Sequence, residues 1–445
     1  MIYEYIKNKM QEHLSSIVYD QNNIISYSEL LNYAETMGEI LKKFKQQKFG
    51  ILCRSNLNSA KNLLMCFYAG KTAVMLSQHY GEKHNKKIIK KIGLTHIITD
   101  NGIESLPETN IAELDDLTDV ALIMCTSGTT GTPKGAMITH ENLIANLNDI
   151  GLYFKITNKD KILIIRPLYH CAVLTGEFLI SLIRGLEIVF SDIGFNPVNI
   201  LKIIKKHEIS VMCGTPTMFF HIGKSIGITS DSHLKIIAVS GECMTETVAK
   251  CARKAFPFAK IYNVYGLTEA SPRVCYLPPE LFDKYPLSVG FPLSNLKTKI
   301  KNNELLVKGK SVMKGYYNDP EATKKVLKRG WLHTGDIAEV NRKGIITIKS
   351  RKDDMIIRAG INIYPQEIEN ALKQDERIKD IVVFGKENET AGQKICVKVV
   401  TDNLSKADIY NICKKLLPLY QLPDIIEIED EIPKNASGKI MRRAS

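Results

Sequence analysis

The chain has 445 residues, of which 44% are hydrophobic and 24% charged, and 60 Lys and Arg against 48 Asp and Glu give a formal net charge of +12. These values exclude a disordered, collagenous or membrane-spanning chain and predict a globular protein of about three units of roughly 150 residues. The ten cysteines stand singly, without a CxxC pair, which argues against structural zinc and a disulfide scaffold. The first residues lack the layout of a signal peptide, so we expect a cytoplasmic location and no membrane span.

From about residue 25 to residue 265, short apolar runs alternate with amphipathic stretches. This alternation predicts a parallel sheet covered by helices on both faces. The apolar runs predict buried strands at Val120–Cys125, Ile162–Ile165, Val211–Cys213, Ile236–Val239 and Ile261–Val264. The amphipathic stretches predict helices at Glu141–Tyr153, Val198–His207 and Thr245–Ala255.

The pattern changes near Ser288. Residues 288–350 contain strand pairs around turn signals such as Asn302-Asn303, which predicts an antiparallel, barrel-like subdomain. After the polar run that begins at Ser350, a small α+β unit of roughly 90 residues is expected. Its predicted elements are helices at Pro365–Gln374 and Lys406–Leu417 and strands at Ile381–Phe384 and Ile395–Val400.

The most informative stretch is 125–135, Cys-Thr-Ser-Gly-Thr-Thr-Gly-Thr-Pro-Lys-Gly, which directly follows an apolar run. Its glycines permit tight turns, and its backbone N–H groups and hydroxyls can form a nest for a phosphate. The Walker A pattern does not occur in the chain. A flexible linker is the competing interpretation, but a linker would not follow a buried strand. The candidate phosphate-binding residues are Thr126, Ser127, Gly128, Thr129, Thr130, Gly131, Thr132 and Lys134.

This stretch resembles the phosphate loop of the adenylate-forming superfamily, which includes acyl- and aryl-CoA synthetases, adenylation enzymes that serve carrier proteins, and luciferases. Further motifs of the family follow in its order. They are Tyr265–Glu269 (YGLTE), Glu304–Val307, Gly315–Tyr317, Trp331–Asp336 (WLHTGD), Arg351–Asp354 (RKDD), Gly360–Pro365 (GINIYP) and Pro433–Lys439 (PKNASGK). Taken singly, residues of these motifs have ordinary structural explanations, and their order supports the resemblance.

The resemblance implies a fold of two domains. Residues 1–350 would form a large α/β N-terminal adenylation domain of doubly wound sheets, with residues 288–350 as its barrel-like subdomain. Residues 351–353 would form a hinge, and residues 354–445 a small, mobile α+β C-terminal domain.

The resemblance also implies a reaction in two halves: a carboxylate attacks the α-phosphate of ATP to give an acyl-adenylate and pyrophosphate, and a thiol then displaces AMP. Cations and donors around the phosphates would ease the approach of one anion to another. Glu269 would hold Mg²⁺, with Thr126 and Thr268 assisting. Lys439 would lie between the carboxylate and the α-phosphate.

Four other residues would bind the nucleoside part of ATP. Tyr265 would stack on the adenine and Gly266 belongs to the same motif. Asp336 would accept hydrogen bonds from the ribose hydroxyls, with Arg351 assisting.

The family motifs place the catalytic lysine and the phosphate loop on different domains. Lys439 would therefore reach the site by domain closure. The resemblance assigns the hinge to Asp353, and after rotation the Gly360 loop would replace Lys439 and help to form the thiol tunnel.

The acid-binding residues are the least defined. Pro167-Leu168-Tyr169-His170 resembles a motif of acyl- and aryl-CoA synthetases in which His170 would gate or line the acid pocket, and a core histidine is the competing interpretation. Thr215, Ser240 and Gly241 are expected to form other walls. No Asp stands where amino-acid-activating enzymes anchor the α-amino group, which disfavours an amino-acid substrate.

The leading hypothesis is an AMP-forming ligase that joins a small-molecule carboxylic acid to CoA. The alternative is a stand-alone ligase that loads the phosphopantetheine of an acidic carrier protein, and a luciferase-like oxygenase or a non-catalytic nucleotide sensor is more remote. Nucleic acid is not expected as a partner, since the densest basic cluster, Lys86-Lys87 and Lys90-Lys91, has no interleaved aromatics. If the +12 charge serves this function, positive charge should gather near Lys134, Arg351 and Lys439; otherwise composition explains it.

Overall fold

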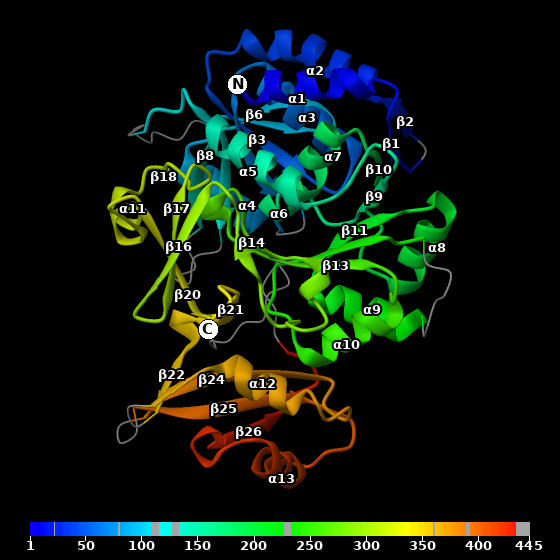
Figure 1. Cartoon of the computed structure of the whole chain (residues 1–445). Helices are drawn as coiled ribbons and strands as arrows, with labels where there is room; N and C mark the ends of the chain where they lie inside the picture. The colour runs from blue at the N-terminus through cyan, green and yellow to red at the C-terminus, as the bar shows by residue number, and fades with distance from the viewer. Residues whose placement is uncertain are drawn as a thin grey trace.

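The computed structural model describes residues 1–21, 23–78, 81–107, 115–126, 133–226, 233–358, 361–388 and 392–432. Two large mixed sheets and a smaller antiparallel sheet form the main part of the molecule, and a further sheet near the C-terminal end lies apart from them (Figure 1). This arrangement matches the predicted α/β fold with a small α+β unit.

The first large sheet has seven strands, parallel at its centre and antiparallel at both edges. Its strands, in spatial order, are β18 (Gly315–Tyr316), β8 (Lys134–Thr139), β7 (Val120–Thr126), β4 (Thr72–Ser77), β3 (Lys48–Cys53), β5 (His96–Thr99) and β6 (Gly102–Ser105).

The second large sheet has nine strands, of which the central six are parallel. In spatial order they are β15 (Phe291–Pro292), β14 (Arg273–Leu277), β13 (Lys260–Gly266), β12 (Ile236–Val239), β11 (Val211–Gly214), β9 (Lys161–Ile164), β10 (Glu187–Phe190), β1 (Ile17–Asp20) and β2 (Asn23–Ser26). The five predicted strands in these two sheets are confirmed to within a few residues.

Helices cover both faces of each large sheet, as the alternating apolar side chains require. In β9, Ile162 and Ile164 join the core between the sheets, whereas Leu163 points into a second core on the other face. The helices of the central core are α1 (Ile2–Met10), α2 (Tyr27–Lys42), α3 (Leu57–Tyr68), α5 (His140–Tyr153), α6 (Cys171–Val173), a π-helical segment (Leu174–Leu179) and α7 (Ile180–Arg184). The outer layers are α8 (Pro197–His207), α9 (Pro216–Ile226) and α10 (Glu246–Ala255) on the nine-stranded sheet and α4 (Gly81–Ile92) on the seven-stranded sheet.

Local sequence fixes where these helices begin. Thr139 caps α5 through a reciprocal pair of hydrogen bonds with Asn142, and Asn196 caps α8 directly before Pro197. Ser26 and Glu29 form the same reciprocal box at α2. The predicted helices at 141–153, 198–207 and 245–255 begin one residue from the observed starts, which the caps Thr139, Asn196 and Thr245 set, and their last residues agree with the structure.

Residues 288–350 are mostly antiparallel strand, as predicted. Asn302 and Asn303 both have positive φ and form the tight turn between two paired strands. The five-stranded sheet consists of β16 (Leu296–Lys301), β17 (Glu304–Gly309), β20 (Trp331–Val340), β19 (Leu327–Lys328) and β21 (Ile346–Arg351). The same stretch also contains α11 (Pro320–Val326), and it lends β15 and β18 to the two large sheets, so it is built into them rather than standing alone.

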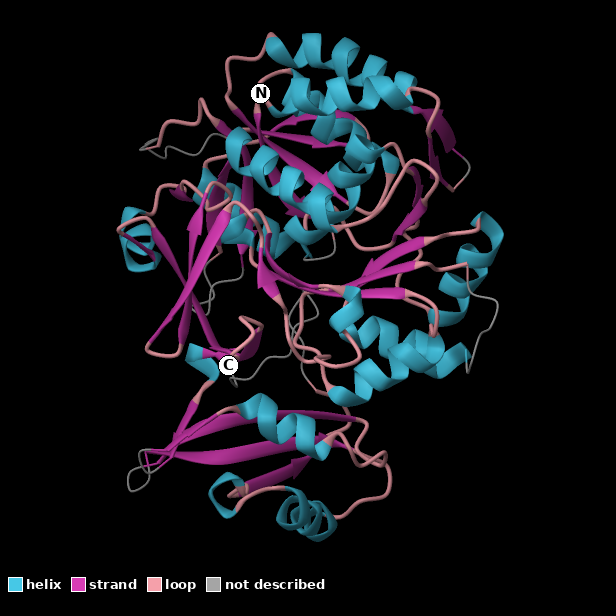
Figure 2. Ribbon diagram, viewed as in Figure 1, coloured by secondary structure: helices cyan, strands magenta, loops and turns pink. Residues whose placement is uncertain are grey.

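The last sheet packs two helices into a core of its own, which includes Ile368 and Ile409. Its strands are β23 (Ile361–Ile363), β22 (Ile356–Arg358), β25 (Gly392–Val400), β24 (Asp380–Asn388) and β26 (Ile425–Ile428), and its helices are α12 (Pro365–Leu372) and α13 (Lys406–Leu416). Figure 2 shows this small unit below the rest of the ribbon. Its four predicted elements are confirmed.

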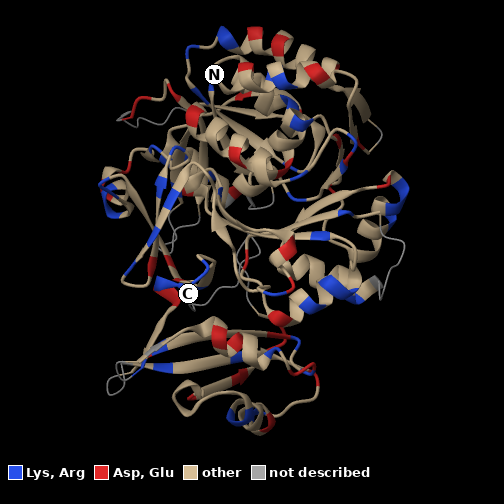
Figure 3. Ribbon diagram, in the orientation of Figure 1, with Lys and Arg blue, Asp and Glu red and all other residues tan. Residues whose placement is uncertain are grey.

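Lysine and arginine are spread over the molecule, including α8, α10, α11 and strand β16 (Figure 3). Among the described residues the positive charge therefore does not gather at one place, and we attribute most of the +12 to composition. In the part of the chain that the structure describes, no helix combines the length and the apolar character that a bilayer span requires.

Candidate active site

Five of the predicted site residues lie at or after the carboxyl ends of parallel strands. Thr126 ends β7, the run to His170 follows β9, Thr215 follows β11, Ser240 follows β12, and Tyr265 lies near the end of β13. In open α/β sheets, ligands bind outside the carboxyl ends of the strands because loops of several strands meet there. The topology thus brings together residues more than 100 positions apart in the sequence.

The predicted phosphate loop connects two antiparallel strands. Thr126 on β7 pairs with Lys134 on β8, so the loop is the connection of a β-hairpin. The Nζ atom of Lys134 lies 5.3 Å from the centroid of the Tyr316 ring, a cation–π distance. The predicted loop residues Ser127, Gly128, Thr129, Thr130, Gly131 and Thr132 lie outside the described residues.

Glu269, the predicted magnesium ligand, is held by a tyrosine. It lies with Thr268 in a single 3₁₀ turn, Thr268–Ala270, and its Oε1 atom accepts a hydrogen bond of 2.8 Å from the hydroxyl of Tyr316. Burial and the adjacent Glu269 carboxylate raise the pKa of Tyr316, which therefore stays a donor at neutral pH. Tyr316 belongs to the Gly315–Tyr317 motif. Its position beside Glu269 depends on the pairing of β18 with β8, which the sequence does not show.

Tyr265, Asp336 and Arg351 form one hydrogen-bonded group. The Tyr265 hydroxyl donates to Oδ2 of Asp336 at 2.5 Å, and Nη1 of Arg351 donates to Oδ1 at 2.9 Å. Asp336 and Arg351 are direct partners on the antiparallel strands β20 and β21. Burial and Asp336 raise the pKa of Tyr265 well above its usual value. The structure thus brings three of the four predicted nucleoside-binding residues into one hydrogen-bonded group.

Gly266 is required by close packing. A Cβ atom at this position would lie 2.1 Å from the carbonyl oxygen of Pro272, closer than any side chain permits. The Leu267 amide donates to the same oxygen at 2.9 Å. Gly266 therefore shapes the turn that presents Thr268 and Glu269.

Three predicted acid-binding residues lie side by side. The Ser240 amide donates to the carbonyl oxygen of Gly214 at 2.9 Å, which brings the ends of β11 and β12 together. Gly241 has φ = +98°, and a Cβ there would lie 3.7 Å from Cγ2 of Thr215. The Oγ atom of Ser240 is buried and has no hydrogen-bond partner among the described residues. A buried hydroxyl without a partner is unusual and fits a ligand-binding position.

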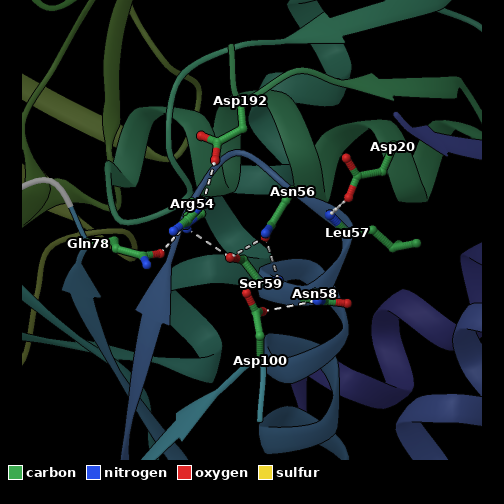
Figure 4. Close-up of polar contacts among 9 residues, drawn as sticks. All are labelled: Asp20, Arg54, Asn56, Leu57, Asn58, Ser59, Gln78, Asp100 and Asp192. Carbon is green, nitrogen blue, oxygen red and sulfur yellow. Dashed lines mark hydrogen bonds and ion pairs between the residues drawn. The ribbon is translucent and has the colours of Figure 1, made fainter. Parts of the chain in front are cut away.

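His170 begins the short helix α6, and its ring centroid lies 4.3 Å from that of Tyr169. The preceding motif is anchored by Arg54, to which no sequence pattern pointed: the Leu168 amide donates to the carbonyl oxygen of Arg54 at 3.3 Å. Figure 4 shows the Arg54 guanidinium between Gln78, beyond β4, and Asp192, beyond β10. Arg54 thus connects segments that follow the carboxyl ends of interior strands in both large sheets, beside the His170 loop.

Asp353, the predicted hinge residue, lies between the main part and the small unit. It belongs to the 3₁₀ turn Lys352–Asp354, directly after Arg351 ends β21 and before β22 begins at Ile356. The predicted tunnel residue Gly360 and the predicted catalytic Lys439 lie outside the described residues.

A surface pocket of about 430 Å³ lies elsewhere, between α1, α5 and α7, and none of the predicted site residues lines it. The site described above is therefore identified by its chemistry and by the strand ends, not by the size of a cavity.

The profile of the AMP-binding enzyme family matches residues 107–317, and that of the AMP-binding enzyme C-terminal domain matches residues 367–439. A long-chain-fatty-acid–CoA ligase of Bacillus subtilis is 34% identical over 357 residues, 75% of this chain and 62% of the relative, so the alignment spans less than two thirds of that protein. The ligase of the same name from Escherichia coli O157:H7 is 30% identical over 93% of this chain and 74% of its own length.

Among solved structures, the O-succinylbenzoate coenzyme A synthetase of Bacillus subtilis in complex with ATP and magnesium ion superposes with a TM-score of 0.88 at 25% identity, and 98% of each chain is covered. The whole described architecture is therefore shared, including the small C-terminal unit. Together with the ordered motifs and their convergence at the strand ends, these similarities show that the chain belongs to the AMP-binding enzyme family.

Proposed function

We propose that this protein is an AMP-forming ligase that activates a carboxylic acid with ATP and transfers the acyl group to the thiol of CoA. The convergence of Lys134, Glu269 and the Asp336–Arg351 pair carries the proposal. Tyr316 contacts both Lys134 and Glu269, and Arg351 lies within electrostatic reach of Glu269. The relatives are named as acid–CoA ligases, which supports the same reaction.

In the first half-reaction, a carboxylate oxygen of the acid would attack the α-phosphorus of ATP as the bond to pyrophosphate breaks. Two anions must approach each other, so positive groups at the phosphates lower the barrier. Lys134 and the loop that precedes it would bind the β- and γ-phosphates. Lys439 would lie at the α-phosphate and the acid carboxylate. Asp336 and Arg351 would orient the ribose, and Tyr265 would pack on the adenine.

The donor set fits a magnesium ion. Mg²⁺ prefers hard oxygen ligands and is commonly held by one or two carboxylates and substrate phosphates. Among the described residues, Tyr316 bonds to one of the two carboxylate oxygens of Glu269. Thr268 precedes Glu269 in the same 3₁₀ turn and Thr126 ends β7, and their hydroxyls would supply further oxygen ligands. When bound, the ion would offset the negative charge of the phosphates.

In the second half-reaction, the CoA thiolate would attack the acyl carbon, and AMP would leave as the C–O bond of the mixed anhydride breaks. We assign the hinge for the change between half-reactions to Asp353, because it lies in the single short turn between β21 and β22. The small domain would then begin at residue 354, and Gly360 would line the path of the thiol.

The test is ATP–pyrophosphate exchange over a panel of aliphatic, aromatic and amino acids. We expect exchange with at least one carboxylic acid, its dependence on Mg²⁺, and its loss in Lys439→Ala with unchanged thermal stability. Absence of exchange over the whole panel would contradict the proposal.

The acceptor is tested separately. Thioester formation with CoA alone is expected. Formation only with a phosphopantetheinylated carrier protein would reject CoA while retaining the adenylation step.

A further inference from the structure

A group of buried polar side chains lies beside the His170 loop and takes no part in the reaction proposed above. Its members are Arg166, Glu177, Ser271 and Arg273. They come from the end of β9, the π-helical segment Leu174–Leu179, the turn after Glu269, and β14. Four polar side chains with two positive charges and one negative charge are unusual in the interior of a sheet protein.

Arg166 and Glu177 form an ion pair, and the two residues stand before and after the His170 loop in the sequence. Nη2 of Arg166 donates to Oε1 of Glu177, and the Glu177 side chain is 0% exposed while that of Arg166 is 13% exposed. Burial raises the pKa of Glu177 and Arg166 opposes this shift. The π-helical segment that presents Glu177 is itself a feature that recurs at functional sites.

Arg273 brings a second guanidinium to the same place. The residue is 2% exposed, and its guanidinium packs on the backbone of Gly176, where a Cβ atom would lie 2.5 Å from Nη2. Arg273 lies within electrostatic reach of Glu177. One carboxylate thus faces two guanidinium groups, which leaves a net charge of about +1 in the interior.

The hydrogen bonding of this group is incomplete. Four buried atoms have no partner among the described residues: Nε of Arg166, Oε2 of Glu177, Oγ of Ser271 and Nε of Arg273. Each unpaired buried polar group is costly, and an unbalanced buried charge costs more. Native proteins contain few such groups, and three of these four atoms, Nε of Arg166, Nε of Arg273 and Oγ of Ser271, can donate, so the group lacks an acceptor.

The group lies on the acid-binding side of the candidate active site. Cys171, the residue after His170, is within electrostatic reach of both Glu269 and Arg273. Arg166 follows β9, next to β11 in the sheet, and β11 leads to Thr215. The polar group therefore lies near the ends of β9 and β11, which lead to His170 and Thr215, and Glu269 marks the direction of the phosphates.

We propose that Arg166, Glu177 and Arg273 form the distal end of the acid-binding site and select an acid that carries a second carboxylate. This inference rests on the proposed function. Guanidinium groups supply donors, so the matching ligand group is an acceptor with negative charge, which a carboxylate provides in planar geometry. An unbranched alkyl acid would leave both guanidinium groups without this partner, and sites with buried polar groups reject analogues that lack the matching group.

The first experiment compares acids of equal length in ATP–pyrophosphate exchange with the full-length protein. Succinate, glutarate and adipate are paired with butyrate, pentanoate and hexanoate, and decanoate represents longer alkyl acids. We expect kcat/KM for the best dicarboxylate to exceed that for its monocarboxylate partner by about tenfold or more. Equal or higher values for the monocarboxylates would overturn the inference.

The second experiment uses Arg273→Met, which keeps an unbranched, flexible stem but removes the guanidinium group and its charge. Activity with the dicarboxylate should fall about tenfold or more, mainly through KM, while activity with the monocarboxylate is unchanged or rises. Arg273→Lys, which keeps the charge but not the fork, should retain part of the preference, so it serves as the test if the methionine variant does not fold. Equal losses with both acid classes would show a structural role only and would contradict the proposal.

Arg253→Met is the matched control. Arg253 lies on the outer helix α10, away from the site, and pairs with Asp283. It should leave the ratio between the two acid classes unchanged. The outcomes separate this inference from the proposed function. Exchange with alkyl acids alone would reject the preference for a dicarboxylate but retain the ligase reaction. Absence of exchange with every acid would reject the ligase reaction itself.

Discussion

The hydroxyl of Tyr316 donates a 2.8 Å hydrogen bond to Glu269, although the two residues are 47 positions apart, Tyr316 on strand β18 and Glu269 in the 3₁₀ turn between β13 and β14. Tyr316 reaches this position because β18 pairs with β8 at the edge of the seven-stranded sheet. The same ring lies beside Lys134 at the end of the predicted phosphate loop. Tyr316 therefore orients the carboxylate to which we assign the metal.

Tyr316→Phe should weaken the use of Mg²⁺ without removing the carboxylate. A hydrogen bond to a charged group contributes about 1.5–3 kcal/mol, so we expect the Mg²⁺ concentration for half-maximal exchange to rise about tenfold. Tyr317→Phe is the matched control, because the Tyr317 hydroxyl accepts a hydrogen bond from Lys48 instead. An unchanged Mg²⁺ dependence in Tyr316→Phe would refute this role.

Asp336→Asn should raise the KM for ATP by about tenfold, because a neutral amide loses the charge that Arg351 pairs with at 2.9 Å and offers the ribose one acceptor fewer. Tyr265→Phe removes only the phenolic donor and keeps the ring, so its effect should be smaller. Both are measured as the ATP dependence of exchange at saturating acid. A larger effect for Tyr265→Phe would mean that the hydroxyl, and not the carboxylate, is the main determinant.

Ser240→Ala should separate activity from stability. The Ser240 hydroxyl is buried without a partner, so its removal should leave the melting temperature unchanged or slightly higher while the KM for the acid rises several-fold. Ser55→Ala is the contrasting variant, since the buried Ser55 hydroxyl donates to the carbonyl oxygen of Ile164 at 2.7 Å, and its loss should destabilise by about 1 kcal/mol. A fall in melting temperature for Ser240→Ala equal to that for Ser55→Ala would argue for a purely structural hydroxyl.

Glu304 should contribute to acid sensitivity. Burial raises its pKa, but the Gly335 amide, His333 and Lys352 outweigh burial, so the pKa is lowered. A lowered folded-state pKa gives stability that is present above the unfolded value of about 4.3 and is lost as the pH falls through the folded value. In Glu304→Gln the free energy of unfolding should therefore fall less between pH 5 and pH 3 than in the parent chain.

The measurement is urea-induced unfolding at several pH values across this acidic range. The control is Glu321→Gln, since Glu321 is 76% exposed and pairs only with Lys324 on the surface. Identical pH dependence in the parent and in Glu304→Gln would contradict the assignment to this carboxyl.

The sequence by itself determined the fold class, the family and most secondary structure. Apolar runs such as Val120–Cys125 are too continuous to be anything but buried strands, and caps such as Thr139 mark helix starts locally. The ordered motifs predicted Glu269, Asp336 and Arg351 as site residues, and the structure brings the latter two into direct contact.

Only the tertiary structure revealed which residues hold the site in place. Tyr316 acts through a strand pairing that no local pattern encodes, and Arg54 joins two sheets that are built from distant parts of the chain. The unpaired state of Arg273 is visible only when every neighbour in three dimensions is known. Local sequence sets backbone conformation and periodicity, whereas hydrogen-bond satisfaction and buried charge balance depend on contacts across the fold, so our proposal for the acid that is selected had to come from the structure.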